Sequence, residues 1–260
     1  MSLLNVKNVT MNFGGINAIK DVSFEVNSNE LVGLIGPNGA GKTTLFNILT
    51  GVYVPTSGEI LFSDKSIVGQ KIYKVTQLGI ARTFQNIRLF KELSVIDNVK
   101  VAMNKDIEYG TITAMFRLPK FYRIEKEVES RALELLEIVG LKGKSEELAK
   151  NLPYGEQRKL EIARALATNP KLLFLDEPAA GMNPQETNDL TSLIQKIKSE
   201  YELTIVLIEH DMSLVMSTCD KIYVLDYGLL IANGSPEEIK KNKRVIEAYL
   251  GEVGDENADD

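Results

Sequence analysis

Hydrophobic residues follow two different spacings along this chain. In residues 3–9 and 22–26 they alternate with polar residues, so that Val22, Phe24 and Val26 fall on one face of their segment. A period of two is typical of strands with one buried face, and such strands usually pair antiparallel. Both segments are therefore predicted to form half-buried antiparallel strands.

Three further runs are apolar almost throughout: residues 31–35, 171–178, which ends in two carboxylates, and 204–208. Segments with helical patterns, 158–168 and 184–200, lie before and after the second run. Strands buried on both faces and separated by helices form parallel sheets covered on both sides. The predicted fold class is α/β, with a mainly parallel sheet and additional antiparallel strands.

An insertion of mostly helical character is predicted within this core. One set of apolar residues recurs at helical spacing and stops just before Gly140, where a helix is expected to end: Val128, Ala132, Leu135, Leu136 and Val139. Residues 109–122 are predicted to be a loop or irregular piece, because Gly110 and Pro119 interrupt them.

The whole pattern predicts one domain over residues 1–250. A strand pair is expected around 226–228 and a helical stretch at 236–250. The acidic residues 251–260 are predicted to form a disordered tail. The predicted boundaries are 1–87 and 158–230 for the core, 88–157 for the helical subdomain and 231–250 for a C-terminal extension.

Composition limits the kind of partner. The 260 residues carry a net charge of −6, which disfavours a nucleic-acid partner. Cys219 is the only cysteine, so no internal disulfide is possible, and a small buried side chain in a reducing compartment is expected. We expect neither a signal peptide nor a membrane span, since no apolar run approaches the roughly 18 residues required. At a membrane, the chain is expected to dock onto an embedded partner.

A glycine-rich segment follows the first apolar run and precedes a helical pattern. Its sequence is Gly36-Pro37-Asn38-Gly39-Ala40-Gly41-Lys42-Thr43, followed by Thr44. The glycines let backbone N–H groups point into one concavity, where phosphate oxygens also meet the positive end of a helix. Lys42 is expected to contact the outer phosphates and Thr43 to bind Mg²⁺. A plain glycine-rich turn is the alternative, but the complete motif in this context predicts binding of a nucleoside triphosphate.

Two carboxylates and the only histidine end the later strands. Asp176 is expected to bind Mg²⁺, and Glu177 to hold the water that attacks the γ-phosphate. His210 can hydrogen-bond the γ-phosphate or that water. The alternatives are a solvated strand-end charge for Glu177 and a structural or exposed side chain for His210. Ligands of parallel sheets bind beyond the carboxyl ends of the strands, so these features are expected to converge on one edge.

With these motifs, residues 1 to about 250 resemble the ATP-binding subunits of ABC transporters. The stretch from Asn151, Asn-Leu-Pro-Tyr-Gly-Glu-Gln-Arg-Lys-Leu-Glu-Ile-Ala-Arg-Ala-Leu, is similar to the signature loop and helix of that family. The resemblance implies that Phe13 stacks on adenine, although local sequence alone favours a core position for its ring. It also makes Gln85 the glutamine at the hinge of the helical subdomain, which we place with both the catalytic and the Mg²⁺-binding residues.

The same resemblance assigns the Mg²⁺ aspartate to Asp176, the catalytic base to Glu177 and the switch histidine to His210. Residues 179–183 match the loop that crosses the dimer interface, with Asn183 in place of the usual aspartate.

The signature departs from the usual pattern, because Pro153 replaces serine and Tyr154 the first glycine. In the family this loop contacts the γ-phosphate of ATP held by the partner subunit. Proline offers neither a hydroxyl nor an N–H, so the contact is expected from the start of the following helix. Tyr154, Gly155 and Glu156 are the candidate contacts, with the N–H of Gly155 as the main donor.

Several stretches are similar to the branched-chain amino-acid importers within this family. They are the tyrosine before the signature glycine, the run Asp-Glu-Pro-Ala-Ala-Gly-Met-Asn-Pro from Asp176, and residues 116–122 and 245–251.

The resemblance implies a transport motor that hydrolyses ATP with Mg²⁺. Two copies, or one copy and a paralogous ATPase subunit, would enclose two ATP molecules. The helical subdomain would dock onto integral membrane permease subunits, which receive cargo from a periplasmic or extracellular solute-binding protein. The expected place is the cytoplasmic face of a prokaryotic cell membrane. The alternatives are an ATPase of the same superfamily without a membrane partner, the ATPase of a lipopolysaccharide exporter, and a P-loop kinase.

Overall fold

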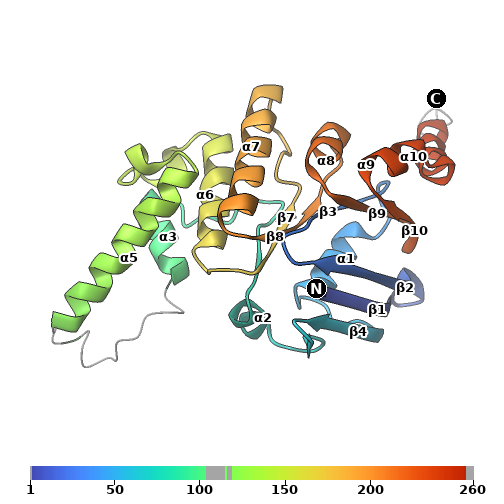
Figure 1. The fold of residues 1–260 in the computed structure, drawn as a ribbon, viewed down its shortest axis with the longest axis horizontal. Coiled ribbons are helices and arrows are strands. Elements are labelled where there is room, and N and C mark those ends of the chain that lie inside the picture. The colour runs from blue at the N-terminus through green and yellow to red at the C-terminus, as the bar shows by residue number, and fades with distance from the viewer. Residues whose placement is uncertain (1, 104–114, 116–118, 256–260) are drawn as a thin grey trace.

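Parallel strands form the centre of the molecule (Figure 1). The computed structural model describes residues 2–103, 115 and 119–255, and contains a six-stranded sheet in the order β10-β9-β3-β8-β7-β6. All neighbours are parallel except β9 and β10, an antiparallel hairpin at one edge. The strands are β3 (Leu31–Ile35), β6 (Ile80–Arg82), β7 (Leu172–Asp176), β8 (Thr204–Ile208), β9 (Lys221–Asp226) and β10 (Leu229–Gly234). The predicted α/β class with a mainly parallel sheet is confirmed.

Alternate side chains of these strands enter two separate cores. Leu31 and Ile35 of β3 belong to one core, whereas Val32 and Leu34 belong to the other. Every residue of β3, β7 and β8 is buried, which explains why their sequences are uniformly apolar.

A smaller antiparallel sheet covers one side of the central sheet. It has the order β2-β1-β4-β5, formed by β1 (Ser2–Phe13), β2 (Ile16–Asn27), β4 (Ser57–Phe62) and β5 (Lys65–Ser66). Val22, Phe24 and Val26 are buried, so the predicted half-buried antiparallel strands are confirmed. Helix α1 (Lys42–Leu49) contributes Leu45, Phe46, Ile48 and Leu49 to the core on this side.

The other side of the central sheet is covered by helices (Figure 1). They are α6 (Tyr154–Leu166), α7 (Pro184–Glu200) and α8 (Met212–Thr218). Helices α3 (Val95–Met103) and α5 (Pro119–Ile138) pack against α6, and α2 (Ile72–Leu78) leads into β6. Two short 3-10 helices, Lys142–Lys144 and Ala149–Asn151, connect α5 to α6. Figure 1 shows α3 and α5 at the end of the molecule away from the antiparallel sheet.

Some element boundaries differ from those predicted. Pro119 does not break a segment but begins α5, because a helix's first residue needs no N–H donor. Residues 109–114 and 116–118 of the predicted irregular piece lie outside the described residues. Helix α6 starts at Tyr154, so the predicted subdomain boundary at 157/158 falls inside it. Pro153 occupies its N-cap, where a fixed φ and a missing N–H are tolerated.

The C-terminal helical stretch is two helices, α9 (Pro236–Lys241) and α10 (Lys243–Asp255). Asn242 separates them, and its side-chain oxygen accepts the N–H groups of Arg244 and Val245, so a new helix begins there. Helix α10 extends over 251–255, where the sequence predicts a disordered tail, since extending an existing helix gains one hydrogen bond per residue. Residues 256–260 of that tail lie outside the described residues. Within the described chain, none of the helices has the length and apolar character needed to cross a bilayer.

Candidate functional site

The glycine-rich segment connects β3 to α1 and requires glycine at two points. A Cβ on Gly36 would lie 2.0 Å from the Leu225 carbonyl oxygen of β9, and one on Gly41 would lie 2.7 Å from that of Ala18. Gly41 also has φ 98° as the N-cap of α1, a conformation that L side chains avoid. The loop is therefore pressed against β2 and β9, and its shape is fixed by backbone contact.

Lys42 reaches back over this loop. Its Nζ donates hydrogen bonds to the carbonyl oxygens of Gly36 at 2.5 Å and Pro37 at 2.8 Å. Thr43 and Thr44 follow in the first turn of α1, with Thr43 exposed, and that turn contains no acidic residue. A cation, a hydroxyl and the positive end of a helix thus share one short segment, which suits a phosphate group. The other residues of the candidate P-loop, Asn38, Gly39 and Ala40, lie between these points.

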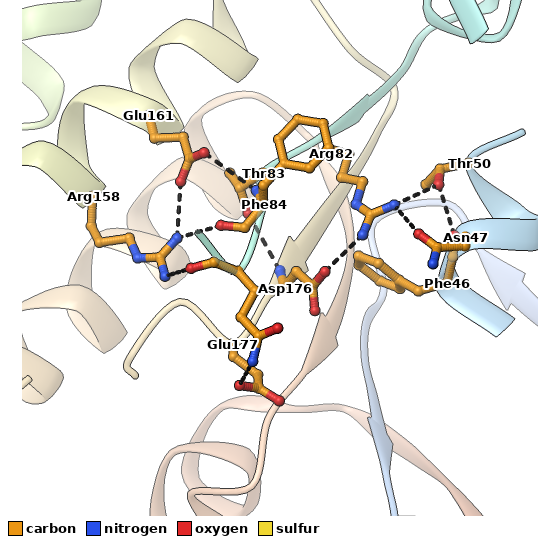
Figure 2. A network of polar contacts seen from close by, with 11 residues as sticks. Phe46, Asn47, Thr50, Arg82, Thr83, Phe84, Arg158, Glu161, Asp176 and Glu177 are labelled. Carbon is orange, nitrogen blue, oxygen red and sulfur yellow. Dashed lines mark hydrogen bonds and ion pairs between the residues drawn. The ribbon is translucent and has the colours of Figure 1, made fainter. Parts of the chain in front are cut away.

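Asp176, at the C-terminal end of β7, is 3% exposed. Burial raises the pKa of its carboxyl group, an effect opposed by the Arg82 guanidinium, which donates to Oδ2 at 2.8 Å. Arg82 also donates to Oδ1 of Asn47 in α1 and to Oγ1 of Thr50, the residue that caps the C-terminal end of α1 (Figure 2). This arginine, unnoticed in the sequence, joins β6, β7 and the helix that follows the P-loop.

Glu177 follows directly and has φ 45°, a strained conformation for a residue with a side chain. Gln85 Nε2 donates to Glu177 Oε2 at 2.8 Å, although 92 positions separate these residues (Figure 2). The structure thus brings two of the three candidate catalytic residues into direct contact.

His210, the third, follows β8, and its side chain is 64% exposed. The adjacent Glu209 is buried and accepts backbone N–H groups from Ala179 at 2.8 Å, His210 at 3.1 Å and Asp211 at 3.3 Å. Burial raises the pKa of Glu209, and these hydrogen bonds oppose the change. Glu209, also unnoticed in the sequence, connects the loops that follow β7 and β8.

Phe13 ends β1 and does not occupy the core. Its ring is 42% exposed and packs edge-on against Tyr53, with the ring centroids 5.5 Å apart. The core position that local sequence alone favoured for Phe13 is therefore wrong, because the hairpin turn at Gly14 and Gly15 leaves this ring at the rim of the sheet.

The candidate signature residues occupy the first turn of α6. Tyr154 is 46% exposed, whereas Gly155 is buried, and a Cβ there would lie 3.0 Å from Glu186 Oε1. Glu156 is engaged within the chain, since Lys144 Nζ lies 2.7 Å from both its carboxylate oxygens.

Asn183 caps α7. Its side chain accepts the N–H of Glu186, whose carboxylate accepts the N–H of Asn183, both at 3.0 Å. The glutamate that packs against Gly155 is therefore held in place by the residue that ends the candidate interface loop.

Oxygen donors at this edge suit Mg²⁺, which prefers hydroxyl, carboxylate, amide and phosphate oxygens. Thr43, Gln85 and Asp176 supply the first three kinds. Among the described residues no group of three or more His, Cys, Asp or Glu side chains forms a metal site. A magnesium ion here would need phosphate oxygens and water to complete its ligands, as is usual where the metal accompanies a nucleotide.

Residues 19–180 match the ABC transporter family, and residues 230–255 match a family described as branched-chain amino acid ATP-binding cassette transporter. The chain is 48% identical over 251 residues to LivG of Escherichia coli, a high-affinity branched-chain amino acid transport ATP-binding protein, covering 96% of this chain and 98% of LivG. BraF of Pseudomonas aeruginosa, described in the same words, is 48% identical with the same coverage.

LptB of Escherichia coli, a lipopolysaccharide export system ATP-binding protein, is 34% identical over 97% of this chain and 98% of its own. Among solved structures, the ADP conformation of MJ1267, an ATP-binding cassette of an ABC transporter, has a TM-score of 0.83 and 31% identity, covering 96% of this chain and 99% of that one. A dimeric cassette, MJ0796 with ADP and phosphate, has a TM-score of 0.76 and 25% identity, covering 90% and 98%.

Proposed function

This chain belongs to the ABC transporter ATP-binding family, and from that premise we propose that it is the ATPase subunit of an importer for branched-chain amino acids. The proposal of ATP hydrolysis is carried by one observation, the contact between Gln85 and Glu177 at the sheet edge where the P-loop begins. Cargo is proposed from LivG and BraF and from the family that matches the C-terminal segment.

We propose that the phosphates of ATP lie over residues 36–44. Lys42 would exchange its two carbonyl partners for phosphate oxygens, which compensates for the lost hydrogen bonds with charge-assisted ones. The exposed ring of Phe13 would stack on adenine. Thr43, Asp176 and Gln85 would hold Mg²⁺, which neutralises charge on the phosphates when bound.

Glu177 would accept a hydrogen bond from water and orient it toward the γ-phosphate. Gln85 fixes one carboxylate oxygen of Glu177, which leaves the other oxygen to face that water. The exposed His210 imidazole, on the neighbouring strand end, would contact the γ-phosphate.

ATP-dependent pairing of two such chains, identical or paralogous, would complete each site. The start of α6 in one chain, with Tyr154, Gly155 and Glu156, would face the γ-phosphate held by the other. The N-terminal end of a 13-residue helix offers partial positive charge there, although Pro153 has no N–H.

Membrane permease subunits would dock beside the helical subdomain, and a solute-binding protein would act through them. A groove of about 560 Å³, which we call the α3–α6 groove, offers a place; its lining includes Arg88, Phe90, Ala102, Arg164 and Thr168. Phe90 is 47% exposed, and such a ring is suited to anchor a partner. This arrangement would place the chain at the cytoplasmic face of a prokaryotic cell membrane, with no nucleic-acid partner.

The experiment that tests hydrolysis compares two glutamates that share a positive φ. Glu177→Gln should bind ATP but lose hydrolysis, by about 100-fold or more. Glu202→Gln is the matched control, because Glu202 has φ 48° and is exposed away from the strand ends that form the site. Wild-type turnover in the Glu177 variant would refute the assignment.

Lys42→Ala tests the nucleotide site itself and should weaken binding of ATP, measured with a fluorescent analogue.

Cargo is tested by deleting the gene and following uptake of labelled leucine, isoleucine and valine. Unchanged uptake of all three would argue for another cargo, including the lipopolysaccharide transport of the less similar LptB.

A further inference from the structure

Among the residues that the structure describes, Arg158 of α6 is the largest side chain with almost no exposure, at 2%. Its guanidinium donates to the carbonyl oxygens of Phe84 and Gln85, two consecutive residues that follow β6. A planar fork with several donors is suited to hold two such acceptors at once. Arg158 therefore fixes the direction of the chain where it leaves β6 (Figure 2).

Glu161, one turn along the same helix, binds backbone N–H groups of the same stretch, whereas Arg158 binds its carbonyl oxygens. Its Oε1 accepts the N–H of Phe84 at 3.3 Å and of Arg88 at 3.4 Å, and its Oε2 accepts Arg158 Nη1 at 3.0 Å. Burial raises the pKa of Glu161, and the charge of Arg158 opposes that change. Donor and acceptor groups of residues 84–88 are thus bound by one ion pair.

The held stretch carries the glutamine that contacts the candidate catalytic carboxylate. Gln85 is exposed apart from this attachment, and its side chain donates to Glu177 at 2.8 Å. We propose that the Arg158–Glu161 ion pair is a positioning element for hydrolysis, which sets the place of Gln85 and through it the orientation of Glu177. This inference rests on the proposed role of Glu177.

The pair also connects to the start of its own helix. Arg158 Nη2 donates to the Tyr154 hydroxyl at 3.3 Å, and the Tyr154 ring lies 3.6 Å from the Cβ position of Gly181. Displacement of Tyr154 by a docking partner would therefore be transmitted to Gln85 through one side chain.

Stability alone does not explain the pair. Buried ion pairs can often be replaced by apolar residues of similar volume without loss of stability, whereas removal of one partner is destabilising. This pair also binds four backbone groups of Phe84, Gln85 and Arg88, so its replacement removes the contacts that hold this stretch as well as two buried charges. Two apolar side chains in place of Arg158 and Glu161 could fill the same volume but could not hold residues 84–88 in position by hydrogen bonds.

The test is the double variant Arg158→Met with Glu161→Leu in the full chain. Its KM for ATP should stay close to wild type, while kcat falls about 10- to 100-fold, the effect of a misplaced catalytic group. Its melting temperature, which the loss of four backbone partners lowers, is measured to confirm that the variant is folded at the assay temperature. Arg131→Met with Glu134→Leu is the matched control, an exposed pair with the same spacing, and should keep wild-type kcat.

A cycle with Gln85→Ala separates positioning from a general structural effect. In the Gln85→Ala background, the double variant should change kcat by no more than about twofold, since its route to Glu177 is already removed. An equal loss in both backgrounds, or wild-type kcat in the double variant, would overturn the inference.

Arg158→Lys provides a second measure if the double variant folds poorly. A single ammonium keeps the ion pair but lacks the two-pronged fork, so kcat should be intermediate with unchanged KM; wild-type kcat would count against positioning.

The activity of Glu177→Gln distinguishes failure of the proposed function from failure of the positioning inference. If that variant hydrolyses ATP, the proposed function fails; if it is inactive while the Arg158 variants are fully active, only the positioning role fails.

Discussion

Arg82 shows how much one side chain can join. Its guanidinium contacts Asp176, Asn47 and Thr50, and lies 5.0 Å from the ring centroid of Phe46 and 5.1 Å from that of Phe84. Its positive charge compensates for the burial of the Asp176 carboxylate, so that the charged form of Asp176 is less costly in the folded protein.

Arg82→Met should therefore lower the free energy of unfolding by about 3 kcal/mol at pH 7. The pKa of Asp176 is already raised by burial, and loss of the arginine raises it further. A raised folded-state pKa gives stability that is complete below the unfolded pKa and lost as pH rises, so the deficit should shrink as pH falls from 7 to 5.

Urea unfolding at both pH values measures this effect. Adding Asp176→Asn to Arg82→Met should recover most of the loss, because the neutral amide needs no counter-charge. A deficit that does not change with pH or with the second substitution would show that packing of Arg82, not its charge, matters.

Cys219 is buried, and its sulfur lies 3.0 Å from the Cβ position of Gly33. Burial raises the pKa of its thiol from 9.0 to about 12. At pH 8 the reactive thiolate should then be roughly 1000-fold scarcer than in an unfolded chain.

We therefore expect the native protein to react very slowly with an aromatic disulfide reagent and the urea-unfolded protein to react fully. Ser192→Cys, at an exposed position, is the control that should react at once. Fast modification of the native wild type would contradict the assigned burial.

At the scale of elements, the cap of α7 explains a departure from the family pattern. Asn183 forms a reciprocal pair of hydrogen bonds with Glu186, which any side chain with a suitable oxygen can make. Asparagine and aspartate are equally good at this position. Asn183 therefore preserves the local fold of the candidate interface loop.

Asn183→Ala should lower the free energy of unfolding by about 1 kcal/mol, whereas Asn183→Asp should change it by no more than a few tenths. Thermal or urea unfolding compares the two variants. Equal losses in both would show that Asn183 acts by some route other than the cap.

Elements with strong local signals were predictable. The uniformly apolar strands and the P-loop carry their pattern within a few residues, and their placement at one sheet edge followed from parallel pairing. The three residues of β6 gave no such signal, since they become a strand only by pairing with β7. Pro119 was wrongly predicted to interrupt a helix, because proline breaks a helix from an interior position but is well suited to its first position.

The supporting residues of the site were hidden for the same reason. Arg82, Arg158 and Glu209 contact partners that lie far away in the sequence, or backbone groups that any residue supplies. No spacing rule reports such contacts. Gln85 and Glu177 were found through the family resemblance, but their direct hydrogen bond was visible only in the structure.

At the scale of the whole molecule, the fold separates two tasks. The P-loop and strand ends lie where the two sheets and α1 meet, whereas α3 and α5 lie at the other end (Figure 1). The α3–α6 groove extends between them, since its lining includes Arg82, the partner of Asp176, as well as Phe90. Residues 82–90 run between these ends and carry both Gln85 and Phe90. The proposed docking and the proposed chemistry are thus adjacent along one stretch of chain.

Phe90→Ala should weaken assembly with membrane permease subunits about tenfold, while ATP binding by the isolated chain stays unchanged. Co-purification in detergent measures assembly. Ile246→Ala is the control, because Ile246 is 43% exposed but lies on α10, outside the groove. Equal retention of permease by both variants would exclude the groove as the docking place.

The burial of the single thiol has a practical consequence. The wild-type chain already serves as an unreactive background for spectroscopic labelling, so one new cysteine marks one place. Tyr122→Cys, at a position 60% exposed on α5, would carry a nitroxide on each copy, and pulsed electron resonance would report the spacing between two such helices with and without ATP.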